Sequence, residues 1–203
     1  MSLAERKPEF KIYLEGGGDR NKALAISLRT AMRTFLQKAG VKRLPQIVAC
    51  GGRTEAYKDF RIALSQKTDA ILLVDSEGPV DESSCWAYLK KTVGWERPPG
   101  ATEEQCQLMV QQMESWFLAD TQALADFYGQ NFHRKSLPTS QSPEAVDRDR
   151  LIKALKKASE KTRKGPYHKG NHQCEILERL DPNLVREKCP HCDKLVQACL
   201  AKE

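Results

Sequence analysis

The sequence predicts an α/β protein with a mostly parallel central sheet of about four strands flanked by helices. Strand-like segments alternate with amphipathic helical segments through the first half of the chain. Residues 70–74 also form an unbroken apolar run (Ala-Ile-Leu-Leu-Val), which is typical of a strand buried on both faces. Strand–helix–strand units place successive strands in parallel, so this order predicts a Rossmann-like sheet with helices on both sides.

The elements follow from local patterns. We expect strands over residues 11–14, 45–50 and 70–74, and helices over 20–39, 54–64 and 84–91. Glycines stop the first two strands, at 16–18 and at 51–52. A fourth strand is expected over 106–111, although a helix through this segment fits almost as well.

The second half of the chain has helical patterns. We expect an amphipathic helix over 114–128, a polar linker over 136–143, a basic helix over 143–157, a basic loop over 161–172, and short helices near 174–180 and 183–200, interrupted around Pro190. The expected organisation is an α/β domain over residues 1–130 and a helical basic C-terminal extension over 131–203 that packs on it.

Composition restricts the class of protein. The chain has 203 residues, of which 40% are apolar and 30% charged, as in globular domains. No run approaches the roughly 18 apolar residues needed to cross a bilayer, and the polar N-terminus predicts no signal peptide. The odd number of cysteines, seven, predicts free thiols and a cytoplasmic location.

Positive charge is concentrated in one segment. Residues 134–170 contain 11 Lys/Arg and four Asp/Glu, a net charge of +7, whereas the whole chain carries +6. The remainder is therefore close to neutral. A basic segment of this kind suits a polyanionic partner, and a solvated helix surface is the alternative interpretation.

Carboxylates follow the expected strands. Glu15 and Asp19 follow the first strand, Asp75 and Glu77 the third, and Glu114 the fourth. Because ligands of open α/β sheets bind beyond the carboxyl ends of the strands, we expect these side chains to converge there. A cation would relieve their repulsion, and oxygen ligands favour Mg²⁺ or Mn²⁺. The three glycines before a helix would let a phosphate approach.

Two of these carboxylates have structural alternatives. Asp19 is also suited to be the N-cap of the helix that follows it. Glu114 is also suited to a first helical turn, where the helix dipole favours negative charge.

The chain resembles the Toprim domain of topoisomerases, primases and overcoming-lysogenisation-defect nucleases, through Glu15-Gly-x-x-Asp19 and Asp75-x-Glu77. More narrowly, it resembles a family of bacterial Toprim-like proteins, domain of unknown function 4276. The matching segments are residues 13–16, 49–53, 73–79 and 113–120, with 169–170 and 189–191.

This resemblance implies roles for three residues. Glu15 would be the general acid/base or a metal ligand, and Asp75 a metal ligand. Glu77 stands where many Toprim domains have a second Asp, which leaves the number of metal ions open. No tyrosine-nucleophile domain is apparent, so the resemblance does not extend to topoisomerase activity. It further implies genomic pairing with an ABC-type ATPase, as in antiphage systems.

Basic and metal-ligating side chains gather near the C-terminus. Basic groups next to an aromatic ring can follow a nucleic-acid backbone and stack a base. The residues expected to do so are Lys161, Arg163, Lys164, Tyr167 and His168, together with Arg53; a mobile solvated loop is the alternative. Lys169 or Lys164 could stabilise charge on a cleaved phosphodiester.

A zinc site is the weaker of two interpretations of the cysteines. His168, His172 and Cys174 with Cys189 and Cys192 offer zinc ligands, but the spacing of the first half is unusual. We expect free thiols there instead.

Three hypotheses follow. The leading one is Mg²⁺- or Mn²⁺-dependent cleavage of nucleic-acid phosphodiesters, with Glu15 and Lys169 catalytic and Asp75, Glu77, Asp19 and Glu114 holding metal. The second is a catalytically silent subunit that binds nucleic acid or an ATPase. The third is a small-molecule phosphotransfer enzyme.

Overall fold

The computed structural model describes residues 10–18 and 21–202 and confirms the α/β class. Four strands form one parallel sheet in the order β2-β1-β3-β4. They are β1 (Lys11–Leu14), β2 (Gln46–Ala49), β3 (Ala70–Asp75) and β4 (Cys106–Met109). Leu14 pairs with Leu73, and Asp75 pairs with Met109. The inner strands β1 and β3 and the edge strand β4 therefore end at the same edge of the sheet.

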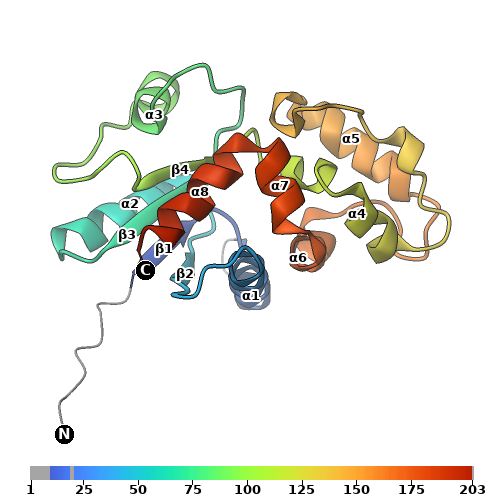
Figure 1. Cartoon of the computed structure of the whole chain (residues 1–203), viewed down its shortest axis with the longest axis horizontal. Coiled ribbons are helices and arrows are strands. Elements are labelled where there is room, and N and C mark those ends of the chain that lie inside the picture. Colours follow the sequence, from blue (N-terminus) through green and yellow to red (C-terminus); the bar gives the residue numbers. More distant parts are fainter. Residues whose placement is uncertain (1–9, 19–20, 203) are drawn as a thin grey trace, which may run out of the picture.

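Helices surround this sheet (Figure 1). They are α1 (Lys22–Lys38), α2 (Arg53–Ser65), α3 (Cys85–Val93), α4 (Thr121–Tyr128), α5 (Arg148–Ser159), α6 (Lys169–Arg179), α7 (Pro182–Lys188) and α8 (Pro190–Leu200). Three short 3₁₀ helices lie at Met113–Leu118, Arg134–Ser136 and Pro143–Ala145. No helix in the described part of the chain is long and apolar enough to cross a membrane.

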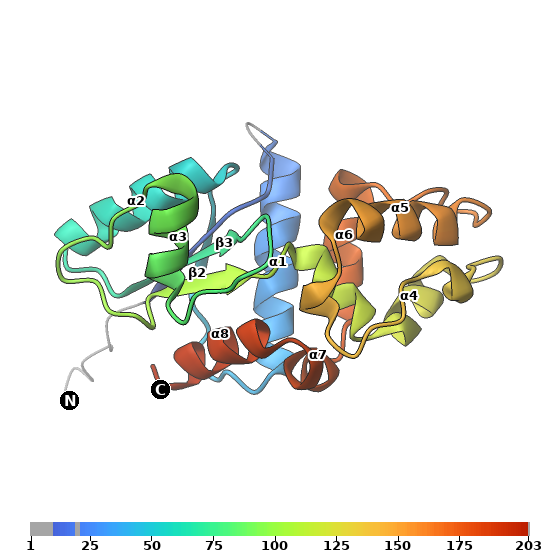
Figure 2. The ribbon, with the colours of Figure 1, turned by 90° about the horizontal axis from the view of Figure 1, so that it is seen from above.

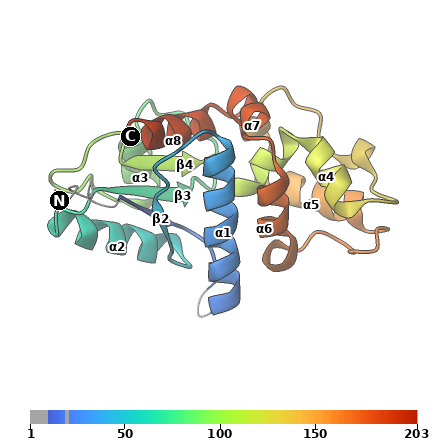
Figure 3. The ribbon, with the colours of Figure 1, turned by 60° about the horizontal axis from the view of Figure 1, so that its bottom comes forward.

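Each face of the sheet has its own apolar core. Ile12 and Leu73 face α1 and the C-terminal helices, whereas Tyr13 and Leu72 face α2 and α3. Figure 3 shows α2 on one side of the strands and α8 on the other. Side chains alternate between faces along a strand, so a sheet covered on both sides needs apolar residues at every position. This explains the unbroken apolar run in β3.

The C-terminal helices complete the first of these cores. Helix α6 packs along α1, and α8 packs on β4; Figure 2 shows α1 between the sheet and the α4–α6 region. The ring of Phe35 in α1 stacks on Trp116, with centroids 5.2 Å apart. Lys38 Nζ donates to the carbonyls of Leu180 and Glu178, at 2.5 and 3.2 Å, just after and within the last turn of α6. The predicted boundary after residue 130 lies in the loop that follows α4, and one apolar core extends across it.

The single helix predicted over 114–128 is wrong. The structure has a 3₁₀ helix at Met113–Leu118 and then α4. Asp120 separates them, because its Oδ1 accepts the N–H of Ala123 at 3.1 Å as the N-cap of α4. Its Oδ2 accepts the N–H of Asp181 at 2.9 Å, which ties this break to the start of α7. Apolar periodicity continues through the break, so the sequence pattern does not reveal it.

Two other helix starts also differ from prediction. Helix α5 begins at Arg148 rather than near Pro143, because Asp147 accepts the N–H of Arg150 at 2.9 Å as its N-cap. Helix α1 is capped by Asn21, which accepts the N–H of Leu24 at 3.0 Å. The alternative role of Asp19 as this cap is therefore wrong, and Asp19 itself lies outside the described residues.

We predict that Gly17→Ala lowers the free energy of unfolding by about 2–4 kcal/mol. Gly17 has φ +91°, and an added Cβ would lie 3.0 Å from Ala49 Cβ and 3.1 Å from Ala25 Cα. The control is Gly40→Ala, at φ +93° with no atom within 4 Å of the new Cβ, which should lose only about 1–2 kcal/mol. Urea denaturation measures both, and equal losses would contradict a close approach at Gly17.

Candidate functional site

Three carboxylates and one lysine meet at the carboxyl edge of the sheet. Glu15 follows β1, Asp75 ends β3, and Glu114 lies in the 3₁₀ helix just after β4. Lys169, the first residue of α6, brings its ammonium between Asp75 and Glu114. The strand order and parallel register account for the first three positions. Only tertiary packing of the C-terminal helices accounts for the fourth.

Glu15 is linked to β3 through the backbone. Its Oε2 accepts the N–H of Asp75 at 3.0 Å, and its own N–H donates to Leu73 at 3.0 Å. Burial raises the pKa of Glu15, the hydrogen bond from Asp75 opposes that rise, and the charge of Glu77 adds to it. A half-buried carboxyl with a raised pKa is better suited to hold a proton and pass it on than an ordinary exposed carboxylate.

Asp75 is a buried acid with a strongly perturbed pKa. Its side chain is nearly inaccessible; Oδ1 accepts the N–H of Met113 at 3.1 Å, and Oδ2 lies 3.7 Å from Lys169 Nζ. Burial raises the pKa of Asp75 to about 7, against the opposing charge of Lys169 and with the help of Glu15 and Glu114. Burial of Asp75 therefore outweighs the stabilisation that Lys169 gives to its ionised form.

Glu114 is fully buried and only half satisfied. Its Oε1 accepts the hydroxyl of Tyr167 at 2.8 Å and lies 3.7 Å from Lys169 Nζ. Its Oε2 has no hydrogen-bond partner among the described residues. Leaving a buried carboxylate oxygen unpaired is costly. Oε2 of Glu114 is therefore a candidate hydrogen-bond acceptor or ligand for a group outside the described residues.

Lys169 lies at the N-terminus of a helix, where a positive charge is unfavourable unless anions lie nearby. A cation at the N-terminus of a helix is disfavoured by the helix dipole, and this lysine is the first residue of α6. Desolvation lowers the pKa of Lys169, but the charges of Glu114, Asp75 and Glu15 outweigh it, and the net shift is upward. Its side chain remains 52% exposed, so the ammonium is both charged and reachable.

A cavity of about 240 Å³ opens beside these groups. Glycine backbone forms part of its wall, and the lining includes Glu15, Asp75, Lys169, residues 16–18 and Gly51. Reciprocal hydrogen bonds of 2.8 and 2.9 Å between Gly16 and Gly51 join the loops that follow β1 and β2. The positive φ values of Gly16, Gly17 and Gly18 show why these positions are glycine. The cavity wall thus contains acidic side chains and also glycine backbone, which a ligand can approach closely.

Glu77 lies next to this cluster but is paired with arginines. Its Oε2 lies 2.8 Å from an Arg53 guanidinium nitrogen, and its Oε1 lies 3.7 Å from one of Arg148. Its φ of +61° turns the chain away directly after Asp75 and Ser76. The predicted metal ligand is thus engaged in ion pairs, as is Arg53, a predicted nucleic-acid contact. Sequence reasoning missed Arg148, which appeared only as part of a charge run.

The predicted nucleic-acid residues divide into two groups. Lys161, Arg163, Lys164 and His168 are exposed, and Lys164 Nζ lies 4.5 Å from the centroid of the Phe127 ring. Tyr167, by contrast, is 2% exposed, with its hydroxyl on Glu114. Its ring is not accessible to a base, so its predicted stacking role is wrong. The apolar body of Tyr167 fills the core and its hydroxyl orients Glu114.

The alternative zinc ligands do not meet. His172 Nδ1 lies 3.1 Å from the Tyr128 hydroxyl and accepts the N–H of His168 at 3.2 Å. Cys189 and Cys192 are buried at the junction of α7 and α8, and burial raises the pKa of both thiols. Within residues 10–18 and 21–202, no three His, Cys, Asp or Glu side chains are arranged to hold a metal ion by themselves.

The fold and site define an α/β protein with an acidic, lysine-containing cavity at the carboxyl edge of a parallel sheet. The model of the family described as "Domain of unknown function (DUF4276)" matches residues 15–199. The chain therefore belongs to this family, and the match spans every residue of the site. No curated protein and no solved structure matches the chain.

We predict that Asp75 makes stability fall as pH rises from about 4 to 7. The folded protein retains a proton on Asp75 that the unfolded chain, with a pKa near ~3.9, releases in this interval. The contribution approaches about 1.4 kcal/mol per pH unit, and Asp75→Asn should remove it. Urea denaturation at several pH values measures the slope. Exposed Asp126→Asn is the control, and an unchanged slope in Asp75→Asn would contradict the assignment.

Proposed function

We propose that the chain is a Toprim-like nuclease that cleaves nucleic-acid phosphodiesters with Mg²⁺ or Mn²⁺. The observation that carries this proposal is that Glu15 and Asp75 line one cavity beside a glycine loop, with the buried Glu114 linked to Asp75 through Lys169. The same arrangement suits a phosphate bridged to carboxylates by a divalent cation.

The residues fit a hard cation in three respects. All candidate donors are carboxylate oxygens, which Mg²⁺ and Mn²⁺ prefer. The Oε2 of Glu114 has no partner among the described residues, and a cation would favour the ionised form of Asp75, whose pKa burial raises to about 7. Mg²⁺ is commonly held by one or two carboxylates together with substrate phosphate and water, so a complete protein cage is not required.

Each side chain then has a distinct task. A bound cation would polarise the phosphate and lower the pKa of an attacking water. Glu15, with its raised pKa, would move a proton at its Oε1 or Oε2. The ammonium of Lys169 would stabilise charge that develops on the cleaved phosphate. Tyr167 would hold Glu114 in place through its hydroxyl.

The basic extension supplies a positively charged surface that suits a nucleic-acid substrate. Residues 161–168 connect α5 directly to Lys169. Beside the end of α5, a hollow of about 710 Å³ is lined by Lys135, Lys157 and Lys161, among other residues. Such a surface attracts a phosphate backbone without reading its sequence.

One observation favours a second candidate, a catalytically silent subunit. Lys169 already partly neutralises Asp75 and Glu114, so the acidic cluster could serve folding alone. The basic surface would then bind nucleic acid, and the partner that the Toprim resemblance implies is an ABC-type ATPase, as in antiphage systems. Under either proposal we place the protein in the cytoplasm, because its seven cysteines are free thiols.

We predict that Glu15→Gln reduces cleavage by about 10²–10⁴-fold, since it removes proton transfer while preserving size and the acceptor for Asp75. Glu114→Gln should weaken Mn²⁺ binding as well as activity. Fluorescent single- and double-stranded DNA and RNA would be incubated with Mg²⁺ or Mn²⁺, and Mn²⁺ affinity would be measured by calorimetry.

Exposed Asp126→Asn is the matched control and should behave as wild type. Wild-type protein that binds nucleic acid but neither cleaves it nor binds Mn²⁺ would overturn the nuclease proposal in favour of the silent subunit. Cleavage that persists in Glu15→Gln would remove Glu15 from the mechanism.

We further predict that reversing Lys157, Lys161 and Arg163 to Glu weakens nucleic-acid binding about tenfold or more at 0.1 M salt. Each lost phosphate contact should also reduce the slope of log affinity against log salt by about 0.7–0.9. Filter binding at several salt concentrations measures both quantities.

The control reverses Lys58, Lys67 and Lys90, which lie on or beside α2 and α3 and give the same change in net charge. Equal losses in the two triple variants would show that only net charge matters. Binding as tight as wild type in the first variant would make this segment a solvated surface.

A further inference from the structure

Two cysteine thiols share a second cavity, distinct from the acidic one. Cys85 is the first residue of α3 and Cys106 is the first residue of β4. Both line a cavity of about 680 Å³ whose opposite wall is formed by α8, including Lys194 and Gln197. Cys85 is partly exposed and Cys106 is buried. Cys85 is therefore the more accessible of the two residues.

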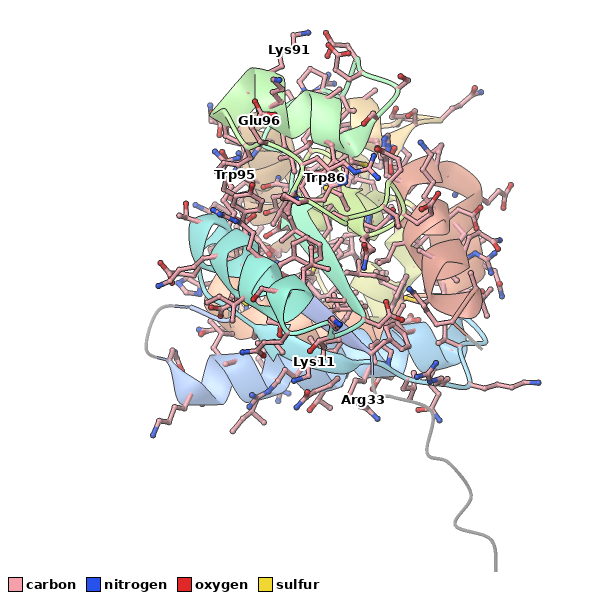
Figure 4. The ribbon with its side chains drawn as sticks, turned by 90° about the vertical axis from the view of Figure 1, so that its left-hand side faces the viewer. Lys11, Arg33, Trp86, Lys91, Trp95 and Glu96 are labelled. Atoms are coloured by element: carbon pink, nitrogen blue, oxygen red, sulfur yellow. The ribbon has the colours of Figure 1, made fainter. Side chains whose placement is uncertain are left out.

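Hydrogen bonds and aromatic contacts fix the backbone around Cys85 and Cys106. The N–H of Cys85 donates to Glu103 Oε1 at 3.0 Å, and Trp86 Nε1 donates to the carbonyl of Thr102 at 2.9 Å. Trp86 also packs against Phe60 of α2, and Trp95 stacks on Tyr57 with centroids 4.3 Å apart. Figure 4 shows Trp86 and Trp95 in the layer between α2 and α3. The start of α3 is thus fixed against the segment that enters β4.

The surroundings lower the pKa of Cys85 and raise the pKa of the other described cysteines. A hydrogen bond from the Cys106 thiol lowers the pKa of Cys85 more than burial raises it; the charge of Glu103 raises this pKa and that of Lys194 lowers it. The N-terminus of α3 favours the same negative charge. Burial raises the pKa of the remaining six, all in the described part of the chain: Cys50 to about 12, Cys174 to about 11, Cys199 to about 12, and Cys106, Cys189 and Cys192 upward.

We propose that Cys85 and Cys106 form an oxidisable dithiol, with Cys85 as the nucleophile toward peroxides and Cys106 as the resolving thiol. The geometry that carries this is the cavity that both cysteines line, with Cys85 partly exposed and Cys106 buried at its wall. The proposal concerns a modification site and does not depend on the nuclease proposal.

The chemistry balances with hydrogen peroxide as the oxidant. The Cys85 thiolate attacks one peroxide oxygen; the O–O bond breaks, and the leaving hydroxide takes a proton to become water. The product is a sulfenic acid at Cys85. The Cys106 sulfur then attacks the Cys85 sulfur, a disulfide forms, and the second oxygen leaves as water with the Cys106 proton. In sum, two thiols are oxidised and one peroxide is reduced to two waters.

The test exposes the full chain to equimolar hydrogen peroxide at neutral pH, followed by alkylation, intact mass spectrometry and peptide mapping. We expect the loss of two of the seven free thiols, a mass lower by two hydrogens, and a Cys85–Cys106 cross-linked peptide. Dithiothreitol should restore all seven thiols.

Matched variants separate the two roles. Cys106→Ala should stop at the sulfenic acid, trapped on Cys85 by dimedone, whereas Cys85→Ser should lose no thiol on the same time scale. Cys50→Ser should match wild type, because Cys50, also partly exposed, donates its thiol to the Val48 carbonyl and has a raised pKa. In the wild-type protein, oxidation of Cys50 as fast as Cys85, or absence of the cross-linked peptide, would overturn the proposal.

Discussion

The attraction between Lys169 and two buried carboxylates joins the two halves of the molecule. Asp75 ends the central strand and Glu114 follows the edge strand, and Lys169 is the cation that compensates whatever negative charge these two acids carry. Burying a charge without a partner costs several kcal/mol, so the sheet depends on the helix that carries Lys169. That helix also needs the sheet, because its N-terminus disfavours a lysine. The extension is therefore part of the site and not only a cover over the core.

The same constraint explains the arrangement around the site. Helix α6 packs along α1, and Lys38 of α1 binds the carbonyls at the end of α6. Tyr167, two residues before Lys169, fixes Glu114 through its hydroxyl. The position of Lys169 is thus set from both sides, by a helix packed on the sheet and by a buried aromatic anchor. A loosely attached basic tail could not hold an ammonium within 3.7 Å of two carboxylates.

Periodicity and strand-end reasoning predicted the sheet and placed Glu15 and Asp75 together, because parallel strands deliver their last residues to one edge. They failed where a side chain acts through tertiary contacts. Asp120 breaks a helix whose apolar spacing is continuous, and Tyr167 resembles a base-stacking residue until its burial is known. From its position after a strand, Glu77 was expected to be a metal ligand. Only the folded chain shows that Arg53 and Arg148 lie beside it. Sequence spacing carries no information on such partners.

Lys169 is a counter-ion of the site, but it does not satisfy every buried acidic group there. The charge of Lys169 lowers the pKa of Asp75, yet burial outweighs it and the pKa stays near 7. Burial is the larger cause, but the repulsion from Glu15 and Glu114 acts in the same direction, and Oε2 of Glu114 remains unpaired. A purely structural ion pair would gain from satisfying that oxygen and from keeping the lysine away from solvent. The observed arrangement meets neither condition, because Lys169 is half exposed and Oε2 of Glu114 has no partner among the described residues.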